Sequence, residues 1–208
     1  MRRLLRRIGW LALALAGGCA APTANLPPDV LQRLQREARA EIYDRQNDIV
    51  IAQGRRDDVL LQLESLRRDG DEIDARAKRV ATRLAKQPEG PVHVAAMKGT
   101  LAAHHAYLDA ERKQAEAALD AADVDLALAS ARLEQTRQRQ LVRTGRALAK
   151  AMAPFDARVD ALEKRSSDLQ RRVQDLRAET EKSYEAWKTA EEQHARAAGD
   201  WDAGIWID

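Results

Sequence analysis

The sequence predicts an all-α protein that folds as a long antiparallel coiled coil. Charged residues make up 33% of the chain and aromatic residues only 4%, a composition typical of long helices and coiled coils. Apolar side chains recur in alternating steps of three and four residues over most of the length, which is the spacing of a heptad seam. The ten glycines and six prolines gather at a few points, so we expect few turns.

The first residues have the pattern of a signal peptide. Four arginines precede a short apolar run from Ile8 to Ala16, and small residues then lead to Cys19. About nine apolar residues are too few to cross a bilayer as a helix, which needs roughly 20. We therefore interpret residues 1–18 as a signal peptide and not as a membrane-spanning segment.

The end of this segment, Leu15-Ala16-Gly17-Gly18-Cys19, resembles the bacterial lipobox. The resemblance implies cleavage before Cys19 and covalent attachment of lipid, with acyl chains such as palmitate, to that residue. The residue after it is Ala20, not Asp, and by resemblance to lipoproteins of two-membrane bacteria this implies the outer membrane, facing the periplasm, over the inner membrane. Cys19 is the only cysteine, so an intramolecular disulfide is excluded.

The charge balance argues against a nucleic-acid partner. Removal of the four arginines of residues 1–18 from the 35 basic residues leaves 31, against 33 acidic residues, so the exported chain carries a net charge of about −2. A nucleic-acid binder needs a surplus of Lys and Arg to neutralise phosphates. We expect no nucleic-acid partner.

Residues 19–28 are interpreted as the lipidated cysteine and a tether. This stretch holds three prolines and has no periodicity, and its chain length allows a reach of at most about 30 Å. A coiled-coil domain follows over 29–198, and Asp29 after two prolines is a typical helix start.

The first helix is expected over about 29–86, with one four-residue stutter near its start. Its seam keeps its phase across Gly70, so we predict one continuous helix there. Arg56 lies on the seam, where it is expected to pair with an acid of a neighbouring helix. The seam positions from 49 to 84 are Ile49, Ala52, Arg56, Val59, Leu63, Leu66, Gly70, Ile73, Ala77, Val80 and Leu84.

The stretch 87–91, Gln-Pro-Glu-Gly-Pro, is the clearest turn in the chain. A second helix is expected over about 92–152. Between Ala115 and Leu133 its apolar residues cover a broad arc, which suits a helix that touches two neighbours.

A third helix is expected over about 155–198, with a seam from Phe155 to Trp201 that includes His194 as a polar, register-setting residue. Pro154 leaves two topologies open. A reversal there gives an up-down-up three-helix bundle, whereas a kink gives a helical hairpin with a Pro-kinked second helix. We favour the reversal because a straight extension of about 65 Å from the end of the hairpin would run into the membrane.

The last ten residues, 199–208, form an aromatic tail without helical periodicity. Two tryptophans and two isoleucines stand among acids and glycines. The tail is interpreted either as a flap over the bundle or as a docking segment for a protein partner. In the second case Trp201, Ile205 and Trp206 are the anchoring side chains.

No pattern of residues indicates catalysis. The chain has no Gly-rich phosphate loop, no GxSxG elbow and no paired CxxC. The histidines, at positions 93, 104, 105 and 194, lack the i, i+4 spacing of zinc pairs on helices. We expect no enzymatic activity, no catalytic or metal-binding residue, and no cofactor other than the lipid on Cys19.

These observations favour a non-enzymatic envelope lipoprotein that acts as a membrane-tethered coiled-coil scaffold or interaction module. Its expected partners are the membrane, through the lipid, and proteins of the cell envelope, with a second copy of the chain as a further candidate. Two alternatives remain open at this point. One is a periplasmic holdase-type chaperone, and the other is a structural lipoprotein that associates non-covalently with the cell wall.

Overall fold

The computed structural model describes residues 21–86 and 90–198, and in these ranges the chain is helical with short connections and no strand. The predicted all-α class and the predicted long helices are confirmed. The elements in chain order are α2 (Pro28–Arg33), α3 (Arg36–Lys86), α4 (Pro91–Arg143), the 3-10 helix η1 (Ala149–Met152) and α5 (Ala153–Ala198).

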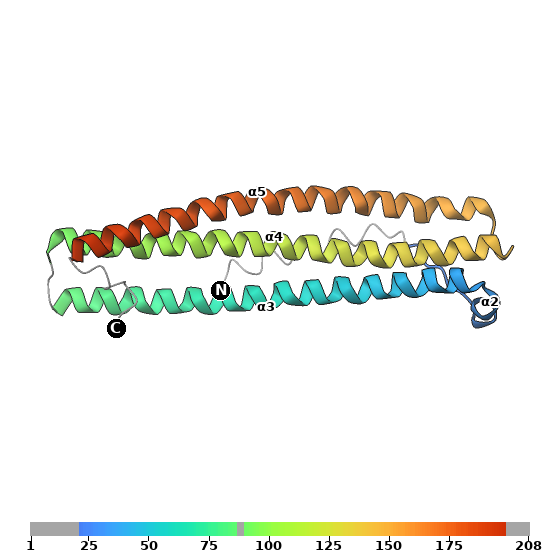
Figure 1. Cartoon of the computed structure of the whole chain (residues 1–208), viewed down its shortest axis with the longest axis horizontal. Coiled ribbons are helices and arrows are strands. Elements are labelled where there is room, and N and C mark those ends of the chain that lie inside the picture. Colours follow the sequence, from blue (N-terminus) through green and yellow to red (C-terminus); the bar gives the residue numbers. More distant parts are fainter. Residues whose placement is uncertain (1–20, 87–89, 199–208) are drawn as a thin grey trace.

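The three long helices lie side by side in an elongated layer with α4 in the middle (Figure 1). Helix α4 packs closely against both α3 and α5, whereas α3 and α5 approach each other at very few points. This central position explains the broad apolar arc of α4, since a helix between two neighbours must bury two faces. The expectation that this helix touches two neighbours is confirmed.

Polar contacts between the helices fix their relative directions. Arg139 of α4 donates to Glu41 of α3 over 3.0 Å, and Arg56 of α3 donates to Asp123 of α4 over 2.6 Å. Because higher numbers on one helix meet lower numbers on the other, α3 and α4 run in opposite directions. The second contact also confirms the expectation that Arg56 pairs with an acid of a neighbouring helix.

Helix α5 returns along α4 in the same way. Arg132 donates to Glu163 over 2.7 Å near one end of the layer. Near the other end, the hydroxyl of Thr100 lies 2.9 Å from the carbonyl oxygen of Ala190. The alignment therefore holds over most of the length of α5.

The predicted seams are the buried faces of the outer helices. Every seam position of α3 from Ile49 to Leu84 is buried or half-buried, and so is every seam position of α5 from Phe155 to Ala197. Helix α3 continues through Gly70 as predicted. The neighbouring polar positions are mostly exposed, so each outer helix contributes one narrow stripe to the core.

The expected tether is wrong for residues 21–27, because these residues pack on the helices. The backbone N–H of Ala24 donates to the Glu134 carboxylate over 2.5 Å, and Arg158 donates to the carbonyl oxygen of Pro22 over 3.4 Å. Ala24 is only 3% exposed. A stretch without periodicity is thus held by contacts with α4 and α5, which sequence spacing cannot reveal.

The first helix differs from the expected range 29–86 because it is broken after Arg33. Leu34 has extended backbone angles (φ −64°, ψ 146°), and α3 begins anew at Arg36. The break falls near the stutter of the seam, and α2 lies beside the start of α3 at the end of the layer (Figure 1). The core cluster formed there consists of Val30, Leu34, Ile42 and Leu133.

The second helix ends at Arg143 and not near 152. Gly145 takes a left-handed conformation (φ 69°), and the N–H groups of Gly145 and Arg146 donate to the carbonyls of Val142 and Leu141. This is a Schellman C-cap, which favours glycine at the left-handed position. The chain then forms η1, and α5 begins at Ala153, with Pro154 in its first turn.

Candidate interaction site

The residues singled out from the sequence lie outside the described ranges. These are Cys19 and the tail residues Trp201, Ile205 and Trp206. Helix α5 nevertheless ends at Ala198, three residues before Trp201, at the end of the layer where α3 also ends and α4 begins (Figure 1). This end carries two features that suit an interaction site.

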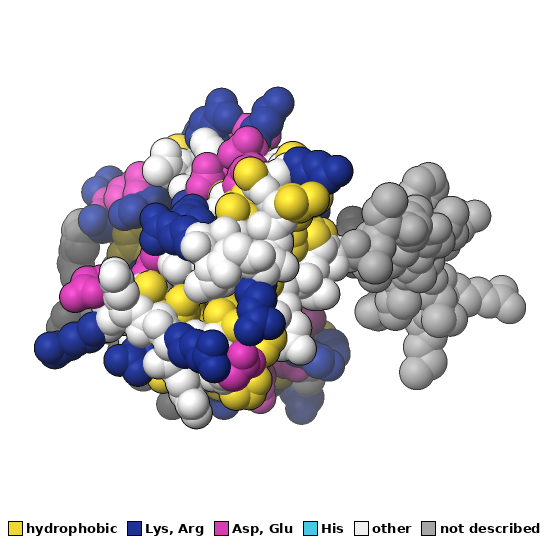
Figure 2. Space-filling view, turned by 90° about the vertical axis from the view of Figure 1, so that its right-hand side faces the viewer, with side chains coloured by type: hydrophobic (Ala, Val, Ile, Leu, Met, Phe, Trp, Pro, Cys, Tyr) yellow, Lys and Arg dark blue, Asp and Glu magenta, His cyan; other side chains and the backbone are white. Residues whose placement is uncertain are grey.

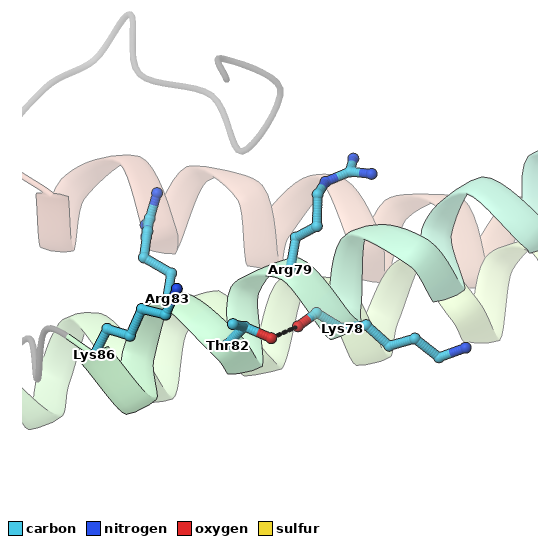
Figure 3. Close-up of a pocket in the computed structure, with 5 residues that line it drawn as sticks. All are labelled: Lys78, Arg79, Thr82, Arg83 and Lys86. Atoms are coloured by element: carbon cyan, nitrogen blue, oxygen red, sulfur yellow. Dashed lines mark hydrogen bonds between the residues drawn. The ribbon is translucent and has the colours of Figure 1, made fainter.

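The first feature is a basic pocket at the end of α3, with a volume of about 550 Å³ (Figure 3). The guanidinium groups of Arg79 and Arg83 extend to the same side of the helix. The hydroxyl of Thr82 donates to the carbonyl oxygen of Lys78 over 2.9 Å. The residues that line the pocket are Lys78, Arg79, Thr82, Arg83 and Lys86.

Two observations account for the positive charge of this pocket. The C-terminal end of a helix has partial negative charge, so Lys and Arg in the last turns stabilise it. In addition, residues 75–88 contain five basic residues and no acid. The pocket is therefore a concentrated positive surface that attracts carboxylates or other anions.

The second feature is an aromatic cluster between α4 and α5, centred on Trp187. The indole stacks on His104 with a centroid distance of 4.1 Å and on Tyr107 with a distance of 5.4 Å. Tyr184 meets both Trp187 and Tyr107 edge to face, at 5.8 and 5.4 Å. Such pairs stabilise an interface beyond the area that they bury.

His104 is neutral in this cluster at physiological pH. Burial, followed by the nearby charges of Arg76 and His105, lowers its pKa from 6.5 to about 4, while Asp69 acts weakly in the opposite direction. Desolvation disfavours the charged imidazolium. The neutral ring can therefore lie flat against the indole.

Tyr107 and Tyr184 also face an open groove of about 680 Å³ between α4 and α5. Burial, followed by a hydrogen bond and the charge of Glu111, raises the pKa of Tyr107 well above its usual value, so its phenol remains protonated. Arg177, Lys182 and further polar residues line the rest of the groove. Aromatic surface beside charged groups is typical of protein interfaces.

Polar side chains fix the register of the helices around this end. The hydroxyl of Thr100, which is 1% exposed, lies within hydrogen-bonding distance of carbonyl oxygens on both α4 and α5. The rings of His93 and His194 lie 5.0 Å apart, so His194 on the predicted seam does contact the opposite helix. These contacts preorganise the surface that the pocket and groove present.

Among residues 21–86 and 90–198 no group of three or more His, Cys, Asp or Glu side chains is placed to hold a metal ion. None of the helices in the described part of the chain has an apolar stretch long enough to cross a bilayer.

Comparison with protein-family models, with curated protein sequences and with solved structures found no match to this chain.

Both features were missed from the sequence, for different reasons. The acid-free basic stretch 75–88 is visible in the sequence and marks the basic pocket. The aromatic cluster joins Trp187 to His104 across 83 positions, so only the register between α4 and α5 could reveal it. No sequence signal available in a single chain fixes that register.

Proposed function

We propose that this protein is a non-enzymatic lipoprotein of the cell envelope that acts as a membrane-tethered scaffold. In this proposal a lipid on Cys19 holds an up-down-up three-helix bundle to the membrane, with the periplasmic face of the outer membrane as its site. The bundle carries a docking site for other envelope proteins at the end remote from its N-terminal segment. The lipobox-like sequence supports the lipid, and the helical layer supports the scaffold.

The observation that carries the proposal is the distance along α4 between the N-terminal segment and the candidate docking site. The segment that follows Cys19 is bound near the end of α4 through Ala24 and Glu134. The basic pocket and the aromatic cluster lie near the start of α4. Along α4, Glu134 lies 30 residues from His104 and 43 residues from Pro91, so at 1.5 Å per residue these regions are roughly 45–65 Å apart.

The docking site would select a partner by charge and aromatic contacts. The basic pocket favours an acidic segment, and Tyr107 and Tyr184 offer aromatic surface beside it. The tail that follows α5 in the sequence supplies Trp201, Ile205 and Trp206 as further anchoring side chains. Aromatic anchors next to a charged rim are typical of interface hot spots.

The anchor is tested by the variant Cys19→Ser in cells. We expect the wild-type protein in the membrane fraction, with a mature form that lacks residues 1–18 and incorporates labelled fatty acid. The variant should incorporate no label and should remain unprocessed at the lipobox. Normal processing and labelling of the variant would refute the lipid anchor.

The docking site is tested by crosslinking in cells with a photoreactive amino acid at position 184. We expect crosslinked partner proteins that disappear when Lys78 and Lys86 are both changed to Glu. The matched control changes Lys150 and Lys164, two exposed lysines near the opposite end of the layer, to Glu and should retain the crosslinked products. Products that are insensitive to the pocket variant would exclude the pocket from docking.

A further inference from the structure

The outer face of α3 carries an unusual amount of exposed apolar surface. Of the eight large apolar side chains that stand exposed in residues 21–86 and 90–198, five lie within 19 positions of this one helix. Helix α3 forms an edge of the layer, with no other described helix on its outer side (Figure 1). The five are Tyr43 (54% exposed), Val50 (65%), Ile51 (54%), Leu60 (38%) and Leu61 (64%).

Three of these side chains share one direction. Tyr43, Val50 and Leu61 are separated by seven and eleven positions, which at 100° per residue brings them within about 20° of each other. The buried Ala52 and the half-buried Leu63 of the seam lie on the opposite side of the same helix. The chain therefore has a second apolar stripe that faces away from α4.

Gly54 also lies on this stripe. A Cβ at this position would meet nothing within 4 Å, although glycine inside a helix is less favourable than alanine. Together with Asn47 and Asp57 it completes a second heptad pattern, 43-47-50-54-57-61, in alternating steps of four and three. A small residue on such a stripe permits close approach of another helix.

We propose that a second copy of this chain packs on the stripe, with the two α3 helices antiparallel and a twofold axis beside residue 52. The register follows from the pattern, because three pairs are placed symmetrically about that residue. Tyr43 meets Leu61 of the second copy, Asn47 meets Asp57 of the second copy, and Val50 lies over Gly54 of the second copy. The contact is isologous, as in most homodimers.

The side chains complement one another in this register. The larger Val50 fills the space left by Gly54, and the Asn47 amide can donate to the Asp57 carboxylate. The Ile51 side chains of the two copies lie beside each other next to the twofold axis. A parallel pair would instead place Asp57 against Asp57, where like charges repel.

The size of the stripe is sufficient for a specific dimer. If Tyr43, Val50, Ile51 and Leu61 each lose on the order of 100 Å² of accessible surface, and Asn47 and Asp57 about 50 Å² each, two copies bury about 1,000 Å², the lower bound for a specific interface. Exposed apolar patches of this extent on a single chain mark interaction sites. Beyond the stripe, Arg36 would face Arg68 of the second copy, which limits the contact to about residues 40–64.

The dimer defines where the other features lie. The contacts of Glu41 with Arg139 and of Arg56 with Asp123 bracket the level of residue 52 on α4. Ala24, bound to Glu134, lies near the same level. The two N-terminal segments therefore lie near the middle of the dimer, and the two basic pockets lie at its opposite ends.

Cysteine crosslinking of the full chain tests the register. Tyr43→Cys protein is mixed with size-tagged Leu61→Cys protein and oxidised, with the unsubstituted chain as the control for Cys19. We expect a Tyr43→Cys–Leu61→Cys heterodimer in most of the protein and no self-crosslinking of either variant above that control. Efficient self-crosslinking of Tyr43→Cys would indicate a parallel pair and overturn the register.

Light scattering of the full chain in detergent tests the face itself. The wild type should be a dimer, and Val50→Asp should weaken dimerisation at least tenfold while its helix content stays the same, because the side chain is exposed in the monomer. The matched control Val92→Asp, with an exposed valine at the far end of the layer, should remain dimeric. A monomeric wild type, or a Val50→Asp variant that remains fully dimeric, would overturn the proposal.

Discussion

The imidazole of His104 lies almost flat on the indole of Trp187, with ring centroids 4.1 Å apart and an interplanar angle of 14°. His104 belongs to α4 and Trp187 to α5, so this contact joins the two helices at the end that carries the basic pocket. Trp187 also contacts both tyrosines of the cluster. Its indole is the centre of the packing at this end.

Replacement of Trp187 with alanine should therefore loosen the end of the layer. We expect a loss of about 2–4 kcal/mol in the free energy of unfolding, because the indole is a large, half-buried side chain with several aromatic neighbours. Trp187→Phe should lose markedly less, since it keeps a ring against His104. Chemical denaturation followed by circular dichroism measures both variants, and equal losses would contradict the stacking role.

Acidification should destabilise the same region through His104. The pKa of His104 is about 4 in the folded chain and 6.5 in its usual state, so between these values the unfolded chain binds more protons. The contribution of His104 to the free energy of unfolding is therefore fully present above about pH 6.5. It is lost as the pH drops towards 4, and the loss is on the order of 1–3 kcal/mol. Comparison of unfolding curves for wild type and His104→Asn tests this, and an unchanged pH dependence in the variant would exclude His104 as its cause.

Two glycines should respond in opposite directions to alanine. Gly145 has φ 69°, a conformation that disfavours a side chain, so Gly145→Ala should destabilise the fold by about 1 kcal/mol. Gly99 lies inside α4, where a Cβ would meet nothing within 4 Å. Gly99→Ala should stabilise the fold by about 0.5–1 kcal/mol. Thermal unfolding of each variant and of the wild type gives the sign of both changes in stability. A Gly145→Ala variant as stable as the wild type would contradict the cap at the end of α4.

The contact between Ala24 and Glu134 should hold the N-terminal segment on the layer. Glu134 accepts from the Ala24 backbone and also pairs with Arg137, so Glu134→Ala should release residues 21–27. Hydrogen exchange of the Ala24 amide should become faster by at least tenfold, while exchange in α5 beyond Ser166 stays unchanged. If the Ala24 amide exchanged as slowly in the variant as in the wild type, the Glu134 carboxylate would not be what holds the segment.

The seams of the outer helices could be predicted because each buries one narrow stripe. A helix with a single buried face repeats its apolar residues with the helical period, as α3 does from Ile49 to Leu84. The same reasoning failed after Arg143. Leu148 and Met152 continue the apolar phase of α4, but the Gly145 cap ends the helix first. The packed segment 21–27 could not be predicted at all, because contacts with Glu134 and Arg158 decide its path and no local pattern encodes them.

The proposed lipid anchor is the part of the account on which the function depends most, and the intact mass of the protein extracted from membranes tests it most directly. We expect a chain that begins at Cys19, with the mass of residues 19–208 plus covalently bound acyl groups. A mass equal to the unmodified full sequence, or to a cleaved chain without acyl groups, would contradict the proposal.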